Sequence, residues 1–343
     1  MSAEEAVSLV SSNQSDALQQ YAKLMYARTE LASGCTLVIL SPITVTTNIL
    51  LLTAIFKDPL KYFKKPTSYF IVGLSGADLL CGLFVEPIFA AHYFGRYFEA
   101  SEKFQAISQT LFLLVSIIAT ASLNASFIMV LMLSVVQFIA IEYPYRYKTW
   151  IKKKFVLPSV LITWVYFTIF SLLPLFGFDQ VLFFKLNLTM HSTLIAVVLA
   201  IIQILTYRAF RGHSRHQKFK RLASSFSSPS HSDSPQNGNT RKFLTKKRGR
   251  GLDRNFIIMT FYLSAILLFS ALPHIGVFYI FLYKQSQTLE EELIVNVLLR
   301  VTDLLLFVKV AADAFIFAWR LPSYRKSLDF LITGKVPELE TGV

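Results

Sequence analysis

Seven runs of apolar residues, each long enough to cross a lipid bilayer, divide the 343-residue chain almost from end to end. A membrane-spanning helix needs about 20 predominantly apolar residues. Five of the runs contain no Asp, Glu, Lys or Arg, whereas a surface helix of a soluble protein shows a charged face. The sequence therefore predicts an all-α membrane protein built as a bundle of seven transmembrane helices. The expected spans are Leu31–Phe56, Pro66–Ala91, Phe104–Ile141, Phe155–Phe178, Leu186–Tyr207, Phe256–Tyr283 and Leu293–Trp319.

The basic residues are concentrated in alternate loops. Lys and Arg follow the first, third, fifth and seventh runs, while the other loops are acidic or nearly neutral. Under the positive-inside rule, this pattern places the amino terminus outside the cell and the carboxyl terminus in the cytoplasm. The net charge of +13 is thus explained by loops that face the anionic inner leaflet, and no nucleic-acid partner is expected. The first 30 residues lack the apolar core of a cleavable signal peptide.

One loop, residues 208–254, is much longer than the others and is basic at both ends. Its centre, 224–239, is rich in Ser, Pro and Asn and has few apolar residues to bury, so we expect the loop 208–254 to be disordered. The basic ends are predicted to contact anionic lipid. A second interpretation adds docking of cytoplasmic partners and phosphorylation of the serines, which would reverse the local charge.

Short motifs indicate few covalent or metal-dependent features. Glycosylation sequences occur at Asn13 and Asn187, both outside in this topology, and a third at Asn124 is expected to be buried. Cys35 and Cys81 are expected at different membrane depths, so no disulfide is predicted. The sequence shows no clustered metal ligands and no Gly-rich phosphate loop. We therefore expect no metal, no cofactor and no catalytic residues.

A set of single residues at ordered positions carries a more specific signal. Asn48, the Leu-Ser-Gly-Ala-Asp sequence at 74–78, Trp164, Pro273 and the Asp-Ala-Phe-Ile-Phe sequence at 313–317 resemble motifs of the rhodopsin-like G-protein-coupled receptors. The resemblance covers residues 31–331. It implies a seven-helix receptor domain over 31–331 with a short amphipathic eighth helix, an extracellular segment 1–30 and a cytoplasmic tail 332–343.

The resemblance also implies a function. Receptors of this kind lie in the plasma membrane and transmit an extracellular ligand to heterotrimeric G proteins, with arrestin and kinases as further candidate partners of the inner loop. The positions that match the activation and G-protein face are Gln137, Tyr207, Pro273 and Phe317.

Several family residues are replaced, which weakens the expectation of conventional coupling. Val136-Gln137-Phe138 stands where the family has Asp/Glu-Arg-Tyr, so the arginine that contacts the G protein is missing. Ala271 replaces the tryptophan of helix six, and Phe112 replaces the cysteine of helix three. A receptor-fold protein that no longer signals, and a seven-helix transporter or channel, therefore stay open as alternatives.

Charged residues inside the last span predict an internal polar network. An ionisable side chain at mid-membrane depth costs about 2.5–3.5 kcal/mol on insertion scales, so it should face the bundle and have a partner. Lys309 and Asp313 are four residues apart and share a helix face. If the resemblance holds, that face looks toward Asp78 and Ser126, with Asn48 in the same network. We hypothesise that Lys309 neutralises Asp78 and Asp313 in place of the sodium ion that many family members hold.

Three other interpretations of Lys309 stay open. The lysine could pair with Asp313 alone, or its long side chain could snorkel elsewhere. It could also indicate an opsin-like retinal Schiff base, although the opsin lysine would fall at Phe307, about 200° around the helix from Lys309.

The outer halves of the helices contain the candidate ligand-binding residues. Amine receptors carry an aspartate in helix three where this chain has Ala119, so the unknown extracellular ligand is not expected to be a typical amine. An alternative is that the arginine and aspartate of the last span pair with each other or rest at the membrane interface. The candidates are Glu86, His274, Phe278, Arg300 and Asp303.

Overall fold

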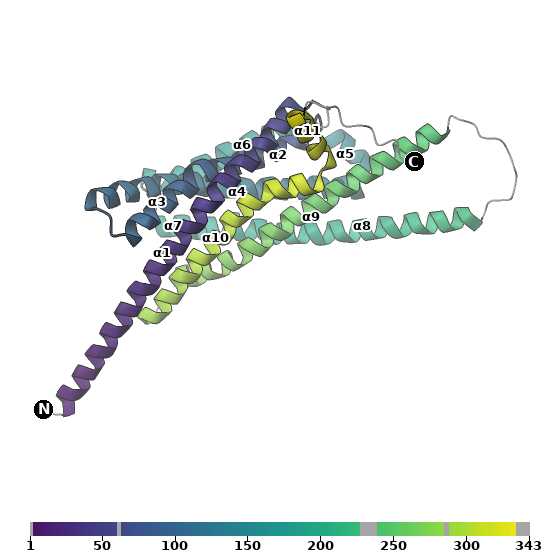
Figure 1. Cartoon of the computed structure of the whole chain (residues 1–343). Coiled ribbons are helices and arrows are strands. Elements are labelled where there is room, and N and C mark those ends of the chain that lie inside the picture. The colour runs from purple at the N-terminus through teal and green to yellow at the C-terminus, as the bar shows by residue number, and fades with distance from the viewer. Residues whose placement is uncertain (1–2, 60–62, 227–238, 285–287, 334–343) are drawn as a thin grey trace.

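The computed structural model of the chain describes residues 3–59, 63–226, 239–284 and 288–333, and every regular element within these ranges is helical. The predicted bundle of seven transmembrane helices is confirmed (Figure 1). The long helices are α1 (Ala3–Lys57), α2 with η1 and α3 (Ser68–Leu80, Cys81–Val85, Glu86–Tyr97), α4 (Glu102–Glu142), α6 (Lys153–Leu172), α7 with η3 and α8 (Gln180–Leu186, Asn187–Thr193, Leu194–Phe226), α9 (Asn239–Tyr283) and α10 (Leu289–Arg320).

Six of the described helical segments are long enough and apolar enough to cross a membrane. The seventh, α10, has 32 residues, which is ample length, but it carries four charged side chains within its predicted span. It packs along both α1 and α9 and so closes the ring of helices. Large apolar side chains such as Ile39, Ile162 and Phe269 are exposed on the outside of the bundle. In a protein that crosses a membrane, these side chains face lipid.

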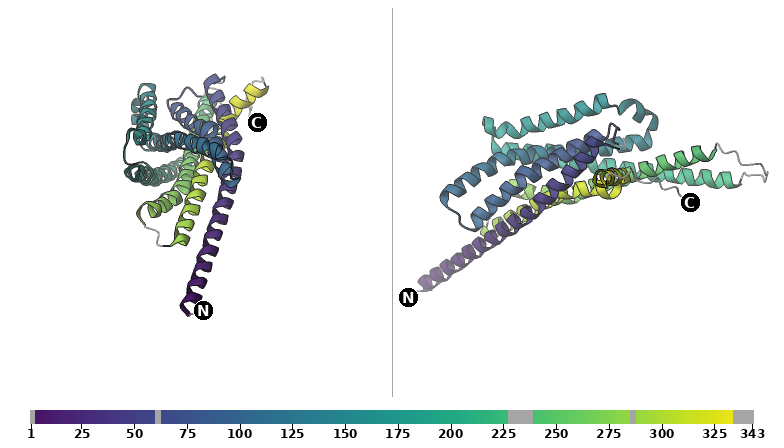
Figure 2. Two further views of the ribbon diagram at one scale, coloured as in Figure 1. Left: turned by 90° about the vertical axis from the view of Figure 1, so that its left-hand side faces the viewer. Right: turned by 45° about the horizontal axis from the view of Figure 1, so that its top comes forward.

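The helix α4 occupies the middle of the bundle. It contacts α2, α3, α6, α8 and α9, whereas α1 contacts α2, α3 and α10. The first part of α1 projects beyond one end of the bundle, and α8 and α9 project beyond the opposite end (Figures 1 and 2). At that second end, α11 (Pro322–Thr333) turns away from the axis of α10 and packs against α1 and α10. The predicted eighth helix is therefore present, with Tyr324 and Ser327 on its buried face.

Helices extend further than the apolar runs suggested. The predicted disorder over 208–254 is wrong for its ends, because α8 continues to Phe226 and α9 begins at Asn239. Lys and Arg are good helix formers, so a helix can continue after it has left the apolar layer. The centre of the loop, 227–238, lies outside the described residues. In the same way α1 begins at Ala3, within the segment 1–30, whereas the tail beyond 333 lies outside the described residues.

Helix ends are set by local chemistry. The Thr288 side chain accepts a hydrogen bond from the Glu291 backbone N–H at 3.2 Å and begins α10, whose first turn carries three Glu residues. The Asp179 side chain caps α7 in the same way, accepting from Leu182 N at 2.7 Å. Helix α4 ends at Glu142, two residues before Pro144, because Tyr143 directly precedes the proline and a residue in that position is disfavoured in helical conformation.

Two of the helices contain π-helical turns, η1 and η3, which are frequent at functional sites. In η1, the Ser41 hydroxyl donates to the Gly82 carbonyl at 2.9 Å. A Cβ atom on Gly82 would lie 2.9 Å from Cγ2 of Thr44, so α1 can approach this turn closely only because the residue is glycine.

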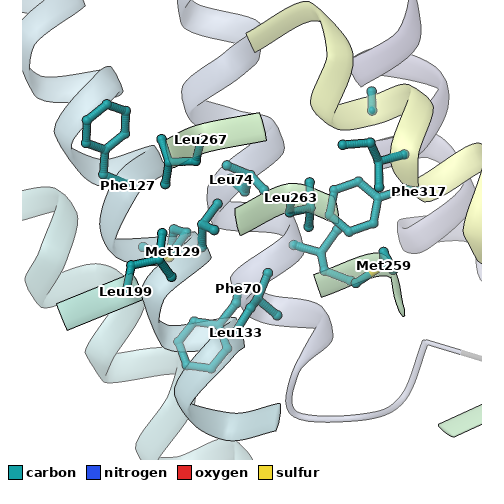
Figure 3. Packing of buried hydrophobic residues seen from close by; sticks show 14 of the residues in the cluster. Phe70, Leu74, Phe127, Met129, Leu133, Leu199, Met259, Leu263, Leu267 and Phe317 are labelled. Carbon is teal, nitrogen blue, oxygen red and sulfur yellow. The ribbon is translucent and has the colours of Figure 1, made fainter. Parts of the chain in front are cut away.

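The largest apolar cluster ties α2, α4, α8, α9 and α10 together (Figure 3). Met259, Leu263 and Leu267 follow one another at four-residue spacing on α9 and are fully or almost fully buried. Phe317 is fully buried in the same cluster. The packing of these side chains holds the helices that surround the sites described below. The labelled members are Phe70, Leu74, Phe127, Met129, Leu133, Leu199, Met259, Leu263, Leu267 and Phe317.

Candidate functional site

A central cavity of about 340 Å³ lies among α3, α4, η3, α9 and α10. Four of the five candidate ligand-binding residues line it together: His274, Phe278, Arg300 and Asp303. Ala119 and Ala271 also line it, where larger or charged side chains would have filled or polarised the space. Aromatic rings dominate the remaining wall, including those of Phe89, Phe112, Phe127, Phe184 and Phe307.

The fifth candidate, Glu86, does not line this cavity, so that expectation is corrected. Its side chain is fully buried and accepts a hydrogen bond from Thr44 Oγ1 of α1 at 3.2 Å. Glu86 directly follows the π-helical turn η1. One extra residue in a turn rotates the following side chains by about 100° relative to an uninterrupted α-helix, and a simple helical reading of the sequence misses this rotation.

The charged groups in the cavity differ in whether they have a partner that can carry the opposite charge. Asp303 Oδ1 lies 3.1 Å from His274 Nδ1. Arg300 donates a hydrogen bond to the Tyr93 hydroxyl, and its guanidinium lies over the Tyr93 ring, 4.2 Å from the centroid. Among the described residues, no carboxylate lies within ion-pair distance of Arg300, and the alternative Arg300–Asp303 pair is not formed. The cavity therefore presents a cation whose hydrogen-bond partner is neutral.

A second cavity, of about 390 Å³, adjoins the first on the side of α1 and shares Leu299, Arg300 and Asp303 with it. Glu30 of α1 lines this outer cavity and pairs with Arg96 at 2.8 Å between Oε1 and Nε. Tyr26 lines it as well and accepts a hydrogen bond from Asn296 Nδ2 at 2.9 Å. Sequence reasoning placed residues 1–30 outside the bundle and therefore missed that Tyr26 and Glu30 line this cavity. Helical periodicity before Leu31 is the only sequence signal that could have indicated it.

The internal polar network is centred on Lys309, which is fully buried. Its Nζ lies 2.7 Å from Asp313 Oδ2 and donates a hydrogen bond to Ser126 Oγ. The same ammonium lies 5.9 Å from the centroid of the Phe127 ring. Asp78 is also fully enclosed and lies within electrostatic reach of both Lys309 and Asp313. The structure thus brings together four of the five residues of the predicted network.

The fifth residue of the predicted network, Asn48, bonds within its own helix. Asn48 is fully buried, but its Nδ2 donates to the Thr44 carbonyl of its own helix at 2.9 Å, and no bond to another helix is recorded in the described residues.

Phe307 lines the central cavity whereas Lys309 does not. The cavity therefore has a phenyl ring at the place of the opsin lysine, and the retinal interpretation has no support.

A three-residue hydrogen-bonded cluster joins α4, α8 and α9. Gln203 Nε2 donates to Ser134 Oγ at 2.9 Å and to Ser264 Oγ at 2.6 Å, and the two hydroxyls lie 2.9 Å apart. All three side chains are buried. We call Gln203, Ser134 and Ser264 the polar clasp. Sequence reasoning missed it, because a lone glutamine in an apolar run has no partner that the sequence identifies.

A third cavity, of about 460 Å³, opens at the end of the bundle where α8 and α9 project, and Gln137 lines it. Lys65, Lys148 and Phe256 lie around it. Of the other predicted activation residues, Phe317 is buried in the main apolar cluster and Pro273 lies within the continuous helix α9. Tyr207 differs from expectation, because its side chain is 55% exposed on the outside of α8.

The structure places the asparagines of the glycosylation sequences in different surroundings. Asn187 is corrected to a bundle residue: its side chain lines the central cavity, and its Oδ1 accepts a hydrogen bond from Asn124 Nδ2 at 2.8 Å. A glycan needs an accessible surface loop, and Asn187 lies in the helical segment η3. Asn124 is buried as predicted. The side chain of Asn13 lies outside the described residues, and Cys35 and Cys81 are both free.

Comparisons with known proteins agree with this architecture. The sequence model of the rhodopsin family of seven-transmembrane receptors matches residues 47–317. Among curated proteins, the chain is 30% identical over 122 residues to the Alpha-1A adrenergic receptor of Oryzias latipes, a stretch that is 35% of this chain and 24% of that receptor. The chain thus spans about a quarter of the length of that relative.

Proposed function

Because the chain belongs to the rhodopsin family of seven-transmembrane receptors, we propose that it is a cell-surface receptor for a small anionic ligand with an apolar body. Family membership makes the chain a multi-pass membrane receptor rather than an enzyme. The alternative of a seven-helix transporter or channel is therefore set aside. The proposal adds the ligand class, the plasma membrane as the location, and an outside amino terminus with α8, α9 and α11 in the cytoplasm. The positive-inside distribution of Lys and Arg supports this orientation.

The observation that carries the proposal is the environment of Arg300. Its guanidinium lies at the boundary of the two outer cavities, stacked on Tyr93, with no carboxylate at ion-pair distance among the described residues. A planar guanidinium presents several donors in a fork that matches a carboxylate or phosphate. The phenyl rings of the central cavity would enclose the apolar part of such a ligand, as in most small-molecule sites.

The adrenergic relative raises the possibility of an amine ligand, which the cavity does not favour. Ala119 lines the cavity at the position where the resemblance to amine receptors would require an aspartate. The carboxylate that lines this cavity, Asp303, lies 3.1 Å from His274 Nδ1, so its Oδ1 already has a neighbour. An ammonium entering the cavity would also meet the charge of Arg300, and like charges in a partly buried site repel strongly.

The ligand hypothesis is tested by thermal stabilisation of the full-length protein in phosphatidylcholine nanodiscs. The probes are long-chain carboxylates, sulfates and phosphate monoesters, each paired with its uncharged methyl ester or alcohol. An anionic probe should raise the melting temperature and its neutral partner should not. Arg300→Gln should weaken that binding by about 10–150-fold, because charge-assisted hydrogen bonds contribute about 1.5–3 kcal/mol.

Arg28→Gln provides a matched control, because Arg28 is an exposed arginine on α1 that lines neither outer cavity. It removes the same charge and should leave probe binding unchanged. Stabilisation by cationic or neutral members of the panel alone would contradict the assignment of an anionic ligand.

Coupling to a G protein is the second part of the proposed function. Gln137 lines the cytoplasmic cavity at the position of the family arginine, so this chain offers an amide where the family offers a cation. We propose that ligand binding shifts the bundle toward a conformation that widens this cavity, as expected for a ligand with different affinities for two states. The same substitution supports the signalling-silent receptor as the second candidate.

G-protein dissociation sensors in cells that express the protein at the surface separate these two candidates. Basal coupling in the parent chain supports a signalling receptor. Coupling in Gln137→Arg but not in the parent supports the silent receptor. Absence of coupling in both, at equal surface expression, would contradict the assignment of a G-protein partner.

A further inference from the structure

A groove of about 390 Å³ opens on the outside of the bundle between α4, α6 and the η3–α8 segment. No residue lines both this groove and the central cavity. Exposed apolar side chains such as Ile162, Met190 and Leu194 form its walls, so its occupant comes from the membrane. The Tyr166 hydroxyl and the His191 imidazole are paired polar groups within this apolar lining.

These two groups begin a chain of hydrogen bonds that runs into the bundle. Tyr166 Oη lies 2.9 Å from His191 Nε2, and His191 Nδ1 lies 3.3 Å from Asn187 Oδ1, which also accepts from Asn124 Nδ2 at 2.8 Å. An amide oxygen can only accept, so Nδ1 of His191 carries the ring proton. In a neutral imidazole Nε2 is then the acceptor, and the Tyr166 hydroxyl donates its hydrogen to it.

This direction leaves the lone pairs of the Tyr166 oxygen facing the groove. The side chain is 51% exposed, and no donor to its oxygen is recorded in the described part of the chain. Tyr166 lies 13 residues after Lys153 at the start of α6, or about 20 Å along the helix. The hydrocarbon layer is about 30 Å thick, so this oxygen lies within it, where no water replaces a missing partner.

We propose that the groove binds a lipid alcohol, a membrane molecule with an apolar body and one hydroxyl group that donates to Tyr166 Oη. The apolar walls match the body, and the single open acceptor matches the single donor. The Tyr166 hydroxyl already donates to His191, and an occupant with an O–H group adds a second hydrogen bond that an alkyl chain cannot make, so the alcohol is preferred.

The same chain of hydrogen bonds connects the groove with the central cavity. Asn187 and Asn124 line that cavity, and His191 fixes Asn187 from the groove side. The η3 segment carries both His191 and Asn187. Binding in the groove would therefore hold one wall of the ligand cavity in its present arrangement, a consequence that rests on the proposed receptor function.

Photolabelling of the full-length protein in phosphatidylcholine nanodiscs tests the binding site directly. The probes are a diazirine-bearing long-chain alcohol and its methyl ether, which has the same body but no O–H group. The alcohol should label the Tyr166 and Met190 peptides about threefold or more above the ether, in the range that one hydrogen bond provides. Tyr166→Phe should remove this preference, because it deletes the hydroxyl whose oxygen is the proposed acceptor and keeps the aromatic ring in the groove wall.

Tyr207→Phe is the matched control, since Tyr207 is a similarly exposed tyrosine on α8 that does not line the groove. It should leave the preference for the alcohol intact. Equal labelling by alcohol and ether in the parent, a preference that survives Tyr166→Phe, or no labelling of the groove by either probe would each overturn the proposal. Labelling requires neither a ligand in the central cavity nor a G protein, so its failure is distinct from failure of the proposed function.

Discussion

Gln203 Nε2 of α8 lies 2.6 Å from Ser264 Oγ of α9, inside a membrane bundle in which both side chains are buried. Ser134 of α4 completes the clasp with bonds to both partners. The clasp lies one helical turn before Gln137 on α4, so it joins three helices near the third cavity, which Gln137 lines. Neutral hydrogen bonds thus hold α9 against α4 and α8 in a chain that lacks the family arginine.

The clasp predicts the effect of removing a single oxygen. Ser264→Ala deletes the acceptor of the shortest bond and leaves buried polar atoms without a partner, so it should lower the free energy of unfolding by about 1–3 kcal/mol. It should also weaken the attachment of α9 and raise basal signalling if the protein couples. The measurements are the melting temperature in nanodiscs and the basal signal of G-protein dissociation sensors.

Ser270→Ala serves as the comparison for this prediction. Ser270 is a buried serine of the same helix, but its hydroxyl donates only to carbonyls of α9, those of Ile266 and Leu267, each at 3.0 Å. Removing it should change the melting temperature less and should leave basal signalling unchanged. Equal effects of the two substitutions would show that the clasp has no special role.

The ammonium of Lys309 predicts an unusual response to sodium. In the parent chain the position between Asp313 and Ser126 is occupied by Nζ, so sodium should not change the melting temperature relative to an organic cation at equal ionic strength. Lys309→Met removes this tethered cation and leaves Asp78 and Asp313 without it. Breaking a buried ion pair costs about 3–5 kcal/mol, so the variant should be markedly less stable in sodium-free buffer.

Sodium should then partly restore the Lys309→Met variant, because carboxylate and hydroxyl oxygens suit a hard cation. At ten times its dissociation constant, a bound cation stabilises a protein by about 1.4 kcal/mol. The additional change Asp78→Asn should abolish the restored response. A sodium effect on the parent as large as that on the variant would contradict the interpretation that Lys309 fills this position.

The placement of Asn187 makes a simple prediction about glycosylation. Its side chain is held inside the bundle by Asn124 and lies in a helical segment, so it should carry no glycan when the protein is expressed in a eukaryotic cell. Asn187→Gln should leave the electrophoretic mobility of the protein unchanged before and after glycosidase treatment. A mobility shift that disappears in Asn187→Gln would show that η3 opens during synthesis.

The fold was predictable because lipid imposes a simple rule on the sequence. Apolar runs of sufficient length indicated the helices. The last run was recognised as a span despite its four charged residues. The same reasoning brought His274, Phe278, Arg300 and Asp303 to one cavity, since their depth follows from residue counts. Lys309 and Asp313 were paired correctly because four residues make about one helical turn.

What sequence reasoning missed has an equally physical cause. It assumed regular helices, and the π-helical turn η1 rotates Glu86 away from the cavity toward Thr44. It treated polar residues singly, and so could not foresee that Gln203 would meet serines about 60–70 residues away in the chain. It also began the first span at the apolar boundary, Leu31, and so left out Glu30, whose partner Arg96 belongs to another helix.

The close approach of α1 to η1 gives a final prediction, in which two glycines with different surroundings are compared. Gly82→Ala would place a Cβ atom 2.9 Å from Cγ2 and 3.0 Å from Cβ of Thr44, both within a packed helix interface. Overpacking of this kind costs about 1–3 kcal/mol, so the variant should melt at a lower temperature. Gly276→Ala adds the same methyl group on α9 with nothing within 4 Å, and there alanine should stabilise the helix by about 0.5–1 kcal/mol. The opposite signs, measured as melting temperatures in the same nanodiscs, isolate the contact with α1 from the general preference of helices for alanine. Stabilisation by both substitutions would mean that α1 is not held against the π-helical turn, and the orientation of Glu86 would then need another cause.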